Sequence, residues 1–139
     1  MASPLRTANE GTFFVTAVTA DRRRLFQTDT NAQLLLETLQ HYRQEKFYLL
    51  HAFVVMPDHI HLLITTEDLP AAMQRIKGGF SHRLGSKVPI WQKGYTDHQV
   101  RNAEEFRSRR GYILQNPVRA RLTERVEDFP YSSAFRKDG

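Results

Sequence analysis

Two histidines one residue apart, His59 and His61, are the residues in this sequence whose type and spacing most clearly could support chemistry. They lie in residues 56–64, MPDHIHLLI, which run into a purely aliphatic stretch. Because side chains alternate between the two faces of a strand, both imidazoles would point to one face and the aliphatic residues to the other, into a core. Two imidazoles so placed can bind one divalent cation. On its own, the pair is interpreted more simply as two partly buried histidines satisfied by ordinary hydrogen bonds.

A second set of polar side chains lies in residues 111–118, GYILQNPV. Tyr112 and Asn116 are four residues apart and therefore share one face of a helix. If that face meets the histidine face, the site holds two imidazoles, one amide oxygen and one phenol. Such nitrogen and oxygen ligands, with open positions, suit Mg²⁺ or Mn²⁺ that also binds phosphate. A phenol, with a free pKa of about 10, is a poor nucleophile that nearby positive charge can activate. Each residue also has an ordinary role, Tyr112 as a half-buried tyrosine and Asn116 as a helix residue before a proline.

Length and composition predict one domain, 1–139, with a polar lead-in at 1–10 and a C-terminal tail at 122–139 that packs on it. Hydrophobic residues make up 40% of the chain and charged residues 25%, which is typical of a soluble globular protein. No apolar run approaches the ~20 residues that a membrane span needs, so we expect no membrane partner. The chain has no cysteine, which excludes a disulfide framework and a thiolate metal site.

Positive charge is concentrated in the second half of the chain. The formal net charge is +5. Residues 1–68 carry 6 Lys and Arg against 8 Asp and Glu, a net charge of −2, whereas residues 69–139 carry 14 against 7, a net charge of +7. This asymmetry favours a polyanionic partner, most simply nucleic acid. The alternative is a solvated basic face without a partner.

The chain pattern predicts an α+β fold in the order strand, helix, strand, strand, helix, strand, helix. This is the split β-α-β order of a ferredoxin-like sandwich, with an antiparallel sheet, two helices on one face and the last helix left to cover the histidine face. The expected strands are 12–18, 47–56, 59–65 and an irregular edge strand at 90–100, interrupted by Gly94. The first expected helix runs from an N-cap at Thr30 to about residue 46. The second has its N-cap at Asp68 and bends or ends at Gly78-Gly79. The third runs from an N-cap at Asn102 to about residue 116, where Pro117 stops the helix.

Four segments in this order, MPDHIHLLI, WQKGYTDHQVR, YILQNPVRARL and EDFPYSSAF, resemble the single-tyrosine transposases of the HUH superfamily. They look closest to the REP-associated tyrosine transposases, and the resemblance runs from about Phe13 to Phe135. It implies a ferredoxin-like catalytic domain that acts on single-stranded DNA with hairpin ends, as a monomer or homodimer, in the cytoplasm of a prokaryotic cell and associated with the nucleoid. It implies that Tyr112 attacks the scissile phosphate, leaving a 5′-phosphotyrosine and a free 3′-hydroxyl. The metal ligands that it implies are His59, His61 and Asn116.

Two positions depart from the family pattern. This chain has Ala120-Arg121-Leu122 where the family often has a glycine, and Gly111 precedes the tyrosine within a helix. Glycine in a helix costs stability, so Gly111 either lets a DNA strand approach the tyrosine or marks a flexible joint. These differences concern substrate fit rather than the reaction type.

Cations and one aromatic residue are candidates for DNA contact, because phosphates attract cations and bases stack on aromatic rings. The candidates are Arg22, Arg23, Arg24, Lys77, Arg83, Lys87, Trp91, Lys93, Arg109, Arg110, Arg119 and Arg121. Residues 22–24 also fit a solvated turn, and core packing is the ordinary role of a tryptophan. His98 is either a further ligand, a DNA contact or a structural residue.

The function that these residues favour is metal-dependent cleavage and joining of single-stranded DNA. One alternative is a non-catalytic nucleic-acid-binding protein derived from such a transposase. A relaxase or replication initiator with the same chemistry is another, disfavoured by the short chain.

Overall fold

A computed structural model describes residues 9–137 of the chain. Three α-helices and four β-strands follow one another in the predicted order, with short 3₁₀ turns between some of them. The elements are β1 (Gly11–Val18), η1 (Ala20–Arg22), η2 (Leu25–Gln27), α1 (Asp29–Gln44), β2 (Leu49–Met56), β3 (His59–Thr66), α2 (Leu69–Leu84), β4 (Thr96–Val100), α3 (Ala103–Arg119) and η3 (Val126–Asp128).

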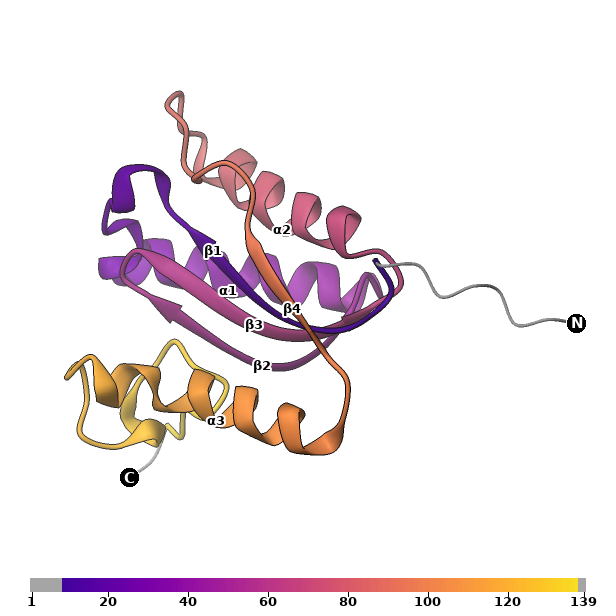
Figure 1. Ribbon diagram of the computed structural model, residues 1–139. Helices are drawn as coiled ribbons and strands as arrows, with labels where there is room; N and C mark the ends of the chain where they lie inside the picture. Colours follow the sequence, from indigo (N-terminus) through magenta and orange to yellow (C-terminus); the bar gives the residue numbers. More distant parts are fainter. Residues whose placement is uncertain (1–8, 138–139) are drawn as a thin grey trace, which may run out of the picture.

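The four strands form one antiparallel sheet in the order β2-β3-β1-β4. Helices α1 and α2 pack side by side on one face, and α3 lies on the other face (Figure 1). This arrangement confirms the predicted ferredoxin-like α+β fold, including the last helix on the histidine face.

Strand alternation divides the apolar residues between the two faces. Phe13, Val15 and Ala17 of β1 and their counterparts on β3 are fully buried against α1 and α2. Ile60, Leu62 and Ile64 are those counterparts, as predicted. A smaller cluster on the opposite face joins β2 and Leu63 to Ile113 of α3 and Phe129 of the tail. Ile113 therefore fixes which side of α3 faces the sheet.

Helix α1 begins two residues earlier than predicted. Thr28, not Thr30, is the N-cap, because its backbone is extended (ψ 141°) and its hydroxyl accepts the N–H of Asn31 at 3.4 Å. The N-caps predicted at Asp68 and Asn102 are confirmed, since their side chains accept the N–H groups of Ala71 and Glu105.

The prediction that α2 bends or ends at Gly78-Gly79 was wrong, because the helix continues to Leu84. Gly79 has a packing role instead. A Cβ at this position would lie 2.6 Å from a ring carbon of Tyr42, so a larger residue would push α1 and α2 apart. Contact between the two helices thus offsets the low helix propensity of glycine.

Helix α3 also extends beyond its predicted end. Pro117 is buried inside the last turn, and the helix ends at Arg119. A proline this close to a C-terminus removes a single intrahelical hydrogen bond. The termination signal is at Arg121, which adopts a left-handed backbone (φ 61°), while the N–H of Leu122 donates to the Pro117 carbonyl at 2.8 Å. This is the position after a helix where glycine is usually found, and in this chain an arginine occupies it.

The predicted strand at 90–100 is shorter than expected. Only Thr96–Val100 pairs with β1 as β4, and Trp91 contributes a single bridge to Thr19. Gly94 (φ 77°) turns the chain between them, as its left-handed backbone allows.

The tail runs along the outer edge of β2. The N–H of Val55 donates to the Tyr131 carbonyl at 2.8 Å, and the N–H of Ser133 donates to the Phe53 carbonyl at 3.0 Å. The Tyr131 hydroxyl donates to Asp29 at the start of α1 (2.6 Å). These bonds cover part of an otherwise open sheet edge. Most of the predicted lead-in, residues 1–8, lies outside the described residues. No helix within residues 9–137 combines the length and the apolar character needed to cross a membrane.

Candidate active site

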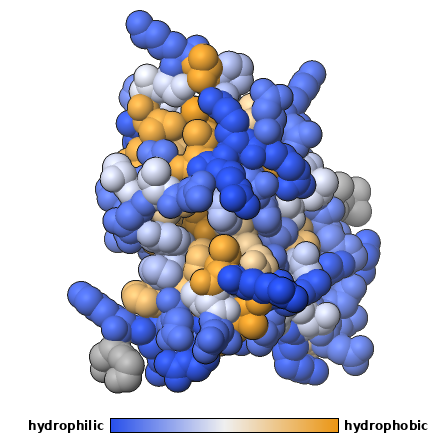
Figure 2. All heavy atoms as spheres, turned by 90° about the vertical axis from the view of Figure 1, so that its left-hand side faces the viewer, coloured by the Kyte–Doolittle hydropathy of each residue, from blue (hydrophilic) through white to orange (hydrophobic). Residues whose placement is uncertain are grey.

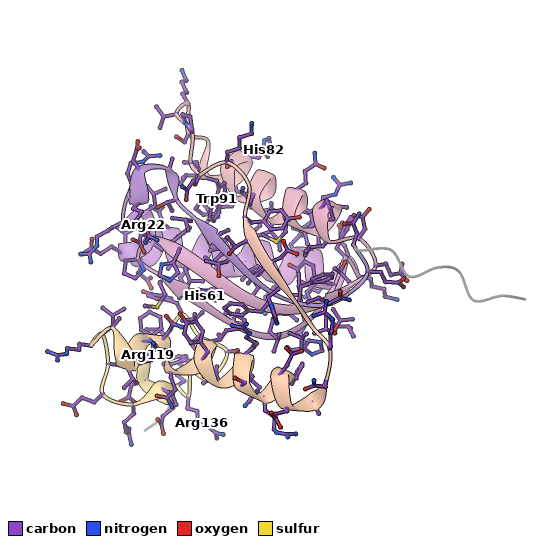
Figure 3. The ribbon with its side chains drawn as sticks, viewed as in Figure 1. Arg22, His61, His82, Trp91, Arg119 and Arg136 are labelled. Atoms are coloured by element: carbon purple, nitrogen blue, oxygen red, sulfur yellow. The ribbon has the colours of Figure 1, made fainter. Side chains whose placement is uncertain are left out.

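His59 and His61 lie side by side on the face of the sheet that α3 covers. Their ring centroids are 4.8 Å apart, with the ring planes at 77°. In Figure 3, His61 lies between the sheet and α3, whereas Trp91 and His82 lie on the side of α2. The His61 ring stacks on Phe14 (5.3 Å, 18°) and meets the edge of the Tyr112 ring (5.5 Å). His61 is thus buried among aromatic and polar groups rather than among the aliphatic side chains of the core.

Each imidazole is hydrogen-bonded through Nδ1. His59 Nδ1 lies 2.7 Å from Asp58 Oδ1, and His61 Nδ1 lies 2.8 Å from Thr16 Oγ1. A carboxylate can only accept a hydrogen bond, so His59 donates from Nδ1. Within residues 9–137, Nε2 of either ring has no hydrogen-bond partner. Burial, and then the charge of His59, lower the pKa of His61 to about 3, so His61 is neutral.

The two imidazoles fit a shared metal ion. The ring centroids are 4.8 Å apart, which is close enough for both imidazoles to reach one ion at metal–nitrogen distances of ~2.1 Å. A hydrogen bond between Nδ1 and an oxygen is the arrangement that metal-ligating histidines usually adopt. The described residues contain no group of three or more His, Asp or Glu side chains that would form a fuller cage.

Tyr112 is partly exposed (38%) and lies beside the histidines. Its ring meets Phe14 edge-on (5.7 Å) as well as His61. The Arg119 guanidinium lies over the Tyr112 ring at 4.9 Å, and the Arg109 guanidinium lies over Phe14 at the same distance. One positive charge therefore lies over the Tyr112 ring and a second over the neighbouring Phe14 ring, and Tyr112 remains open to solvent.

Asn116 lies one turn beyond Tyr112. Its Nδ2 donates to the Tyr112 carbonyl at 2.8 Å, and its Oδ1 has no hydrogen bond within residues 9–137. The structure thus brings His59, His61 and Tyr112 into contact, and its contacts join Asn116 to the backbone of Tyr112 rather than to either imidazole. The ligand role of Asn116 stays a prediction. A Cβ at Gly111 would meet nothing within 4 Å, so close packing does not require glycine there.

Several of the candidate DNA contacts have partners within the protein. Lys77 donates to the carbonyls of Gln92 (3.2 Å) and Gly94 (2.6 Å), and burial lowers its pKa. Arg23 donates to the Pro89 carbonyl, and Arg83 packs over Tyr42 of α1. These contacts give Lys77, Arg23 and Arg83 structural roles.

Trp91 packs between the Phe26 and Phe80 rings, and its Nε1 donates to the Lys77 carbonyl at 3.0 Å. This is the core role given above as the alternative to base stacking. His98 Nε2 lies 3.3 Å from the Glu105 carboxylate in a hydrogen bond that joins β4 to α3, which favours the structural interpretation of that residue. The remaining cationic candidates are exposed or half-buried: Arg22, Arg24, Lys87, Lys93, Arg109, Arg110, Arg119 and Arg121.

The turn between β2 and β3 and the C-terminal end of α3 lie at one end of the molecule, on the left of Figure 1. Arg22 and Arg119 lie toward this end (Figure 3). Figure 2 views it directly: hydrophilic side chains cover most of the surface, and small groups of hydrophobic atoms are exposed between them. Such a mixed surface can contact both a charged backbone and apolar rings.

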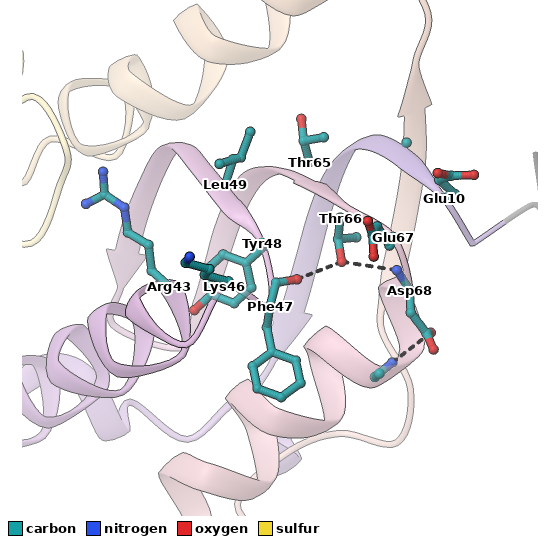
Figure 4. A pocket seen from close by; sticks show the side chains of 12 residues that line it. Glu10, Arg43, Lys46, Phe47, Tyr48, Leu49, Thr65, Thr66, Glu67 and Asp68 are labelled. Atoms are coloured by element: carbon teal, nitrogen blue, oxygen red, sulfur yellow. Dashed lines mark hydrogen bonds between the residues drawn. The ribbon is translucent and has the colours of Figure 1, made fainter.

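A hollow of about 960 Å³ lies at the opposite end of the sheet, near the start of β2 and the end of β3 (Figure 4). Three carboxylates line it, those of Glu10, Glu67 and Asp68. Thr66 donates to the Phe47 carbonyl at 2.8 Å, so part of its polar lining is already bonded. Two cations, Arg43 and Lys46, also line it, but His59, His61 and Tyr112 do not, and this hollow is not the candidate site.

Three residues of the site were missed by sequence reasoning. Phe14 stacks on His61, Thr16 bonds its Nδ1, and Asp58 bonds Nδ1 of His59. Asp58 directly precedes His59, so its position in the sequence was a usable signal. Thr16 and Phe14 depend on the register of β1 against β3, which pairs Thr16 with His61.

Comparisons with known proteins show the family to which this chain belongs. The family model described as IS200-like transposase matches residues 9–116. The REP-associated tyrosine transposase of Escherichia coli (strain K12) is 32% identical over 130 residues, which cover 91% of this chain and 78% of the relative. A solved structure of a REP-associated tyrosine transposase bound to a REP hairpin superposes with a TM-score of 0.81 at 30% identity, covering 96% of this chain and 82% of that one. By both the family model and these relatives, the chain belongs to the IS200-like transposase family.

Proposed function

We propose that this chain cleaves and rejoins single-stranded DNA with hairpin ends, with Tyr112 as the nucleophile. The observation that carries the proposal is the contact between the Tyr112 ring and the His61 ring, which in turn contacts the His59 ring. Nε2 of each histidine has no hydrogen-bond partner within residues 9–137. A phenol beside a two-histidine metal site is the arrangement that a tyrosine-dependent phosphoryl transfer needs. Hairpin ends are proposed because the similar solved transposase is bound to a REP hairpin.

In the proposed reaction, the Tyr112 oxygen attacks the scissile phosphorus and loses its proton to solvent. The bond from phosphorus to the 3′-oxygen breaks, and that oxygen takes up a proton to become a free 3′-hydroxyl. The 5′ end of the downstream strand stays on Tyr112 as a phosphotyrosine. One phosphodiester is exchanged for another, so a 3′-hydroxyl can reverse the step and join strands without ATP.

The side chains around Tyr112 have separate roles. Arg119, over the phenol ring, stabilises negative charge as it develops on the tyrosine oxygen and the phosphate. Phe14 of β1 contacts both the Tyr112 ring and the His61 ring and holds them in place. Exposed cations of α3 and its C-terminal turn, Arg110 and Arg121 among them, contact the backbone of the strand.

His59 and His61, with Asn116 as the proposed third ligand, would hold Mg²⁺ or Mn²⁺. When bound, the ion polarises the scissile phosphate and offsets charge on its oxygens. The donor set fits these ions, because two imidazoles and an amide oxygen would leave positions open for phosphate and water.

Strands labelled at one end or the other test the proposal. With a hairpin strand labelled at its 3′ end and Mg²⁺ or Mn²⁺ present, we expect a covalent protein–DNA adduct that a chelator prevents. With the label at the 5′ end, we expect a shorter free strand that ends in a 3′-hydroxyl. Mass spectrometry of the digested adduct should place the DNA on the peptide that contains Tyr112.

Two results would contradict the proposal. An adduct that carries the 5′-labelled fragment would reverse the polarity of the reaction. Retained binding of a panel of hairpin strands, with no adduct from any of them, would favour the non-catalytic binding protein instead.

A further inference from the structure

We propose that Asp58 and Thr16 are positioning residues that fix both histidines as the Nδ1–H tautomer, so that both Nε2 lone pairs are preset for one metal ion. The inference rests on the proposed function, since it concerns the same two histidines. It goes beyond it by assigning roles to two residues that touch neither the phosphate nor the tyrosine. The geometry that carries it is one oxygen at hydrogen-bond distance from each Nδ1, 2.7 Å for His59 and 2.8 Å for His61.

The carboxylate of Asp58 is held in place from two directions. Its backbone carbonyl accepts from both the N–H and the hydroxyl of Thr19, each at 3.0 Å, which fixes the turn between β2 and β3. Its second oxygen, Oδ2, accepts from Arg22 at 3.2 Å. With one oxygen bound to arginine, the other remains for His59. The carboxylate thus accepts from Arg22 through one oxygen and lies at hydrogen-bond distance from His59 Nδ1 through the other.

The backbone that carries Arg22 supports this role. Asp21 and Arg22 both adopt left-handed conformations, with φ of 55° and 50°. Two consecutive residues other than glycine in this region are unfavourable, and such strain persists where surrounding contacts maintain it. Here the strained turn brings the Arg22 guanidinium to Asp58. Asp58 directly precedes His59, which pairs with Val18 at the end of β1.

Thr16 has the corresponding role for His61. The two residues are direct partners in the β1–β3 register, so their side chains leave the same face of the sheet. The His61 ring is stacked on Phe14, which fixes its plane, and Thr16 Oγ1 has no other hydrogen-bond partner within residues 9–137. In the proposed tautomer this hydroxyl accepts from Nδ1–H of His61, and a flip of the ring within its plane would break that bond.

The physical gain is preorganisation. In free solution the two neutral tautomers of histidine interconvert, and only the one protonated on Nδ1 can ligate through Nε2. Partners of this kind typically change metal affinity by 10- to 100-fold when removed. We expect each of Asp58 and Thr16 to contribute within that range to Mn²⁺ affinity.

Imidazole ¹⁵N spectra of the metal-free protein test the inference without any DNA. In the wild type we expect His59 and His61 to be protonated at Nδ1. The isosteric variant Thr16→Val should shift His61 toward a mixture of tautomers and weaken Mn²⁺ binding, measured by electron paramagnetic resonance, about 10- to 100-fold. Thr16→Ser, which restores a hydroxyl, should recover both. Valine favours strands, so the fold should survive, and the backbone amide spectrum checks this.

The Asp58 variants form a second, independent pair. Asp58→Ala should release the His59 tautomer and weaken Mn²⁺ binding, whereas Asp58→Asn keeps an acceptor oxygen and should retain both. The wild-type spectrum is decisive even if a variant fails to fold, because a proton on Nε2 of either histidine overturns the proposal. Unchanged tautomers and Mn²⁺ affinity in Thr16→Val and Asp58→Ala would also overturn it. Since the assay needs no cleavage, a missing DNA adduct would count against the proposed function alone.

Discussion

Replacing Tyr112 by phenylalanine should separate catalysis from every other property of the protein. The Tyr112 hydroxyl has no hydrogen-bond partner within residues 9–137, and the residue is 38% exposed. The ring contacts with Phe14, His61 and Arg119 do not involve that oxygen. We therefore expect the free energy of unfolding to change by less than ~0.5 kcal/mol and cleavage to fall by ~10³-fold or more, because the attacking atom is gone.

Tyr131→Phe is the matched control, because the same chemical change has the opposite consequences there. The Tyr131 hydroxyl donates to the Asp29 carboxylate at 2.6 Å, and this bond raises the pKa of Tyr131 to about 12. A hydrogen bond to a charged group contributes ~1.5–3 kcal/mol, which solvent exposure reduces here to about 1 kcal/mol. Tyr131→Phe should lose that stability and keep full cleavage activity, since the residue lies in the tail at the β2 edge.

The two variants would be compared by urea unfolding, by binding to a hairpin strand and by adduct formation on 3′-labelled DNA. An adduct formed by Tyr112→Phe would refute the assignment of the nucleophile. Tyr95 would then be the next candidate, although it packs against the main core and its pKa is raised, first by burial and then by Asp97 and Asp68. A large loss of stability in Tyr112→Phe would instead refute the argument that its hydroxyl is unbonded.

Three further outcomes follow from the fold and its charges. If Arg119 contacts a phosphate, Arg119→Ala should reduce the magnitude of the slope of log affinity against log salt concentration by ~0.7 in titrations with single-stranded DNA. Arg125 is ion-paired with Asp128, and Arg125→Ala should leave that slope unchanged. Arg121→Gly should raise the free energy of unfolding by about 0.5–1 kcal/mol, because Arg121 has a left-handed backbone that glycine adopts without strain. Thermal unfolding measures this effect, and a lower melting temperature in the variant would contradict the prediction. Burial lowers the pKa of His51 from its ordinary 6.5. The unfolded chain therefore binds a proton at His51 more readily than the folded protein, and the free energy of unfolding should decrease as the pH falls below 6.5. In urea unfolding at pH 7.5 and pH 5, this decrease should be smaller in His51→Gln than in the wild type.

Much of the fold follows from local patterns in the sequence. The alternation in residues 59–64 correctly placed both histidines on one face and Ile60 and its aliphatic neighbours in the core. Asp68 and Asn102 were correctly identified as N-caps, because a short polar side chain before an apolar run has a local role. The four-residue spacing of Tyr112 and Asn116 likewise placed both on one helix face. These features depend on neighbours within a few residues along the chain, so they can be predicted from the sequence alone.

Where local preference competes with packing, the sequence alone misled. Gly79 favours a helix break, yet close contact with Tyr42 keeps α2 continuous. Pro117 favours a helix end, yet it is buried in the last turn of α3. The same holds for cations: Lys77 fits a phosphate contact by charge, but carbonyls 15 and 17 residues away bind it.

The details of the site were decided only by tertiary structure. The sequence determined that two imidazoles share a face, that a phenol lies on a helix, and that positive charge follows them in the chain. It could not determine that Thr16 lies opposite His61, 45 residues away, or that Arg22 reaches Asp58 across 36 residues. Strand register and helix docking set these contacts, and both depend on the packing of the whole core rather than on the order of neighbouring residues.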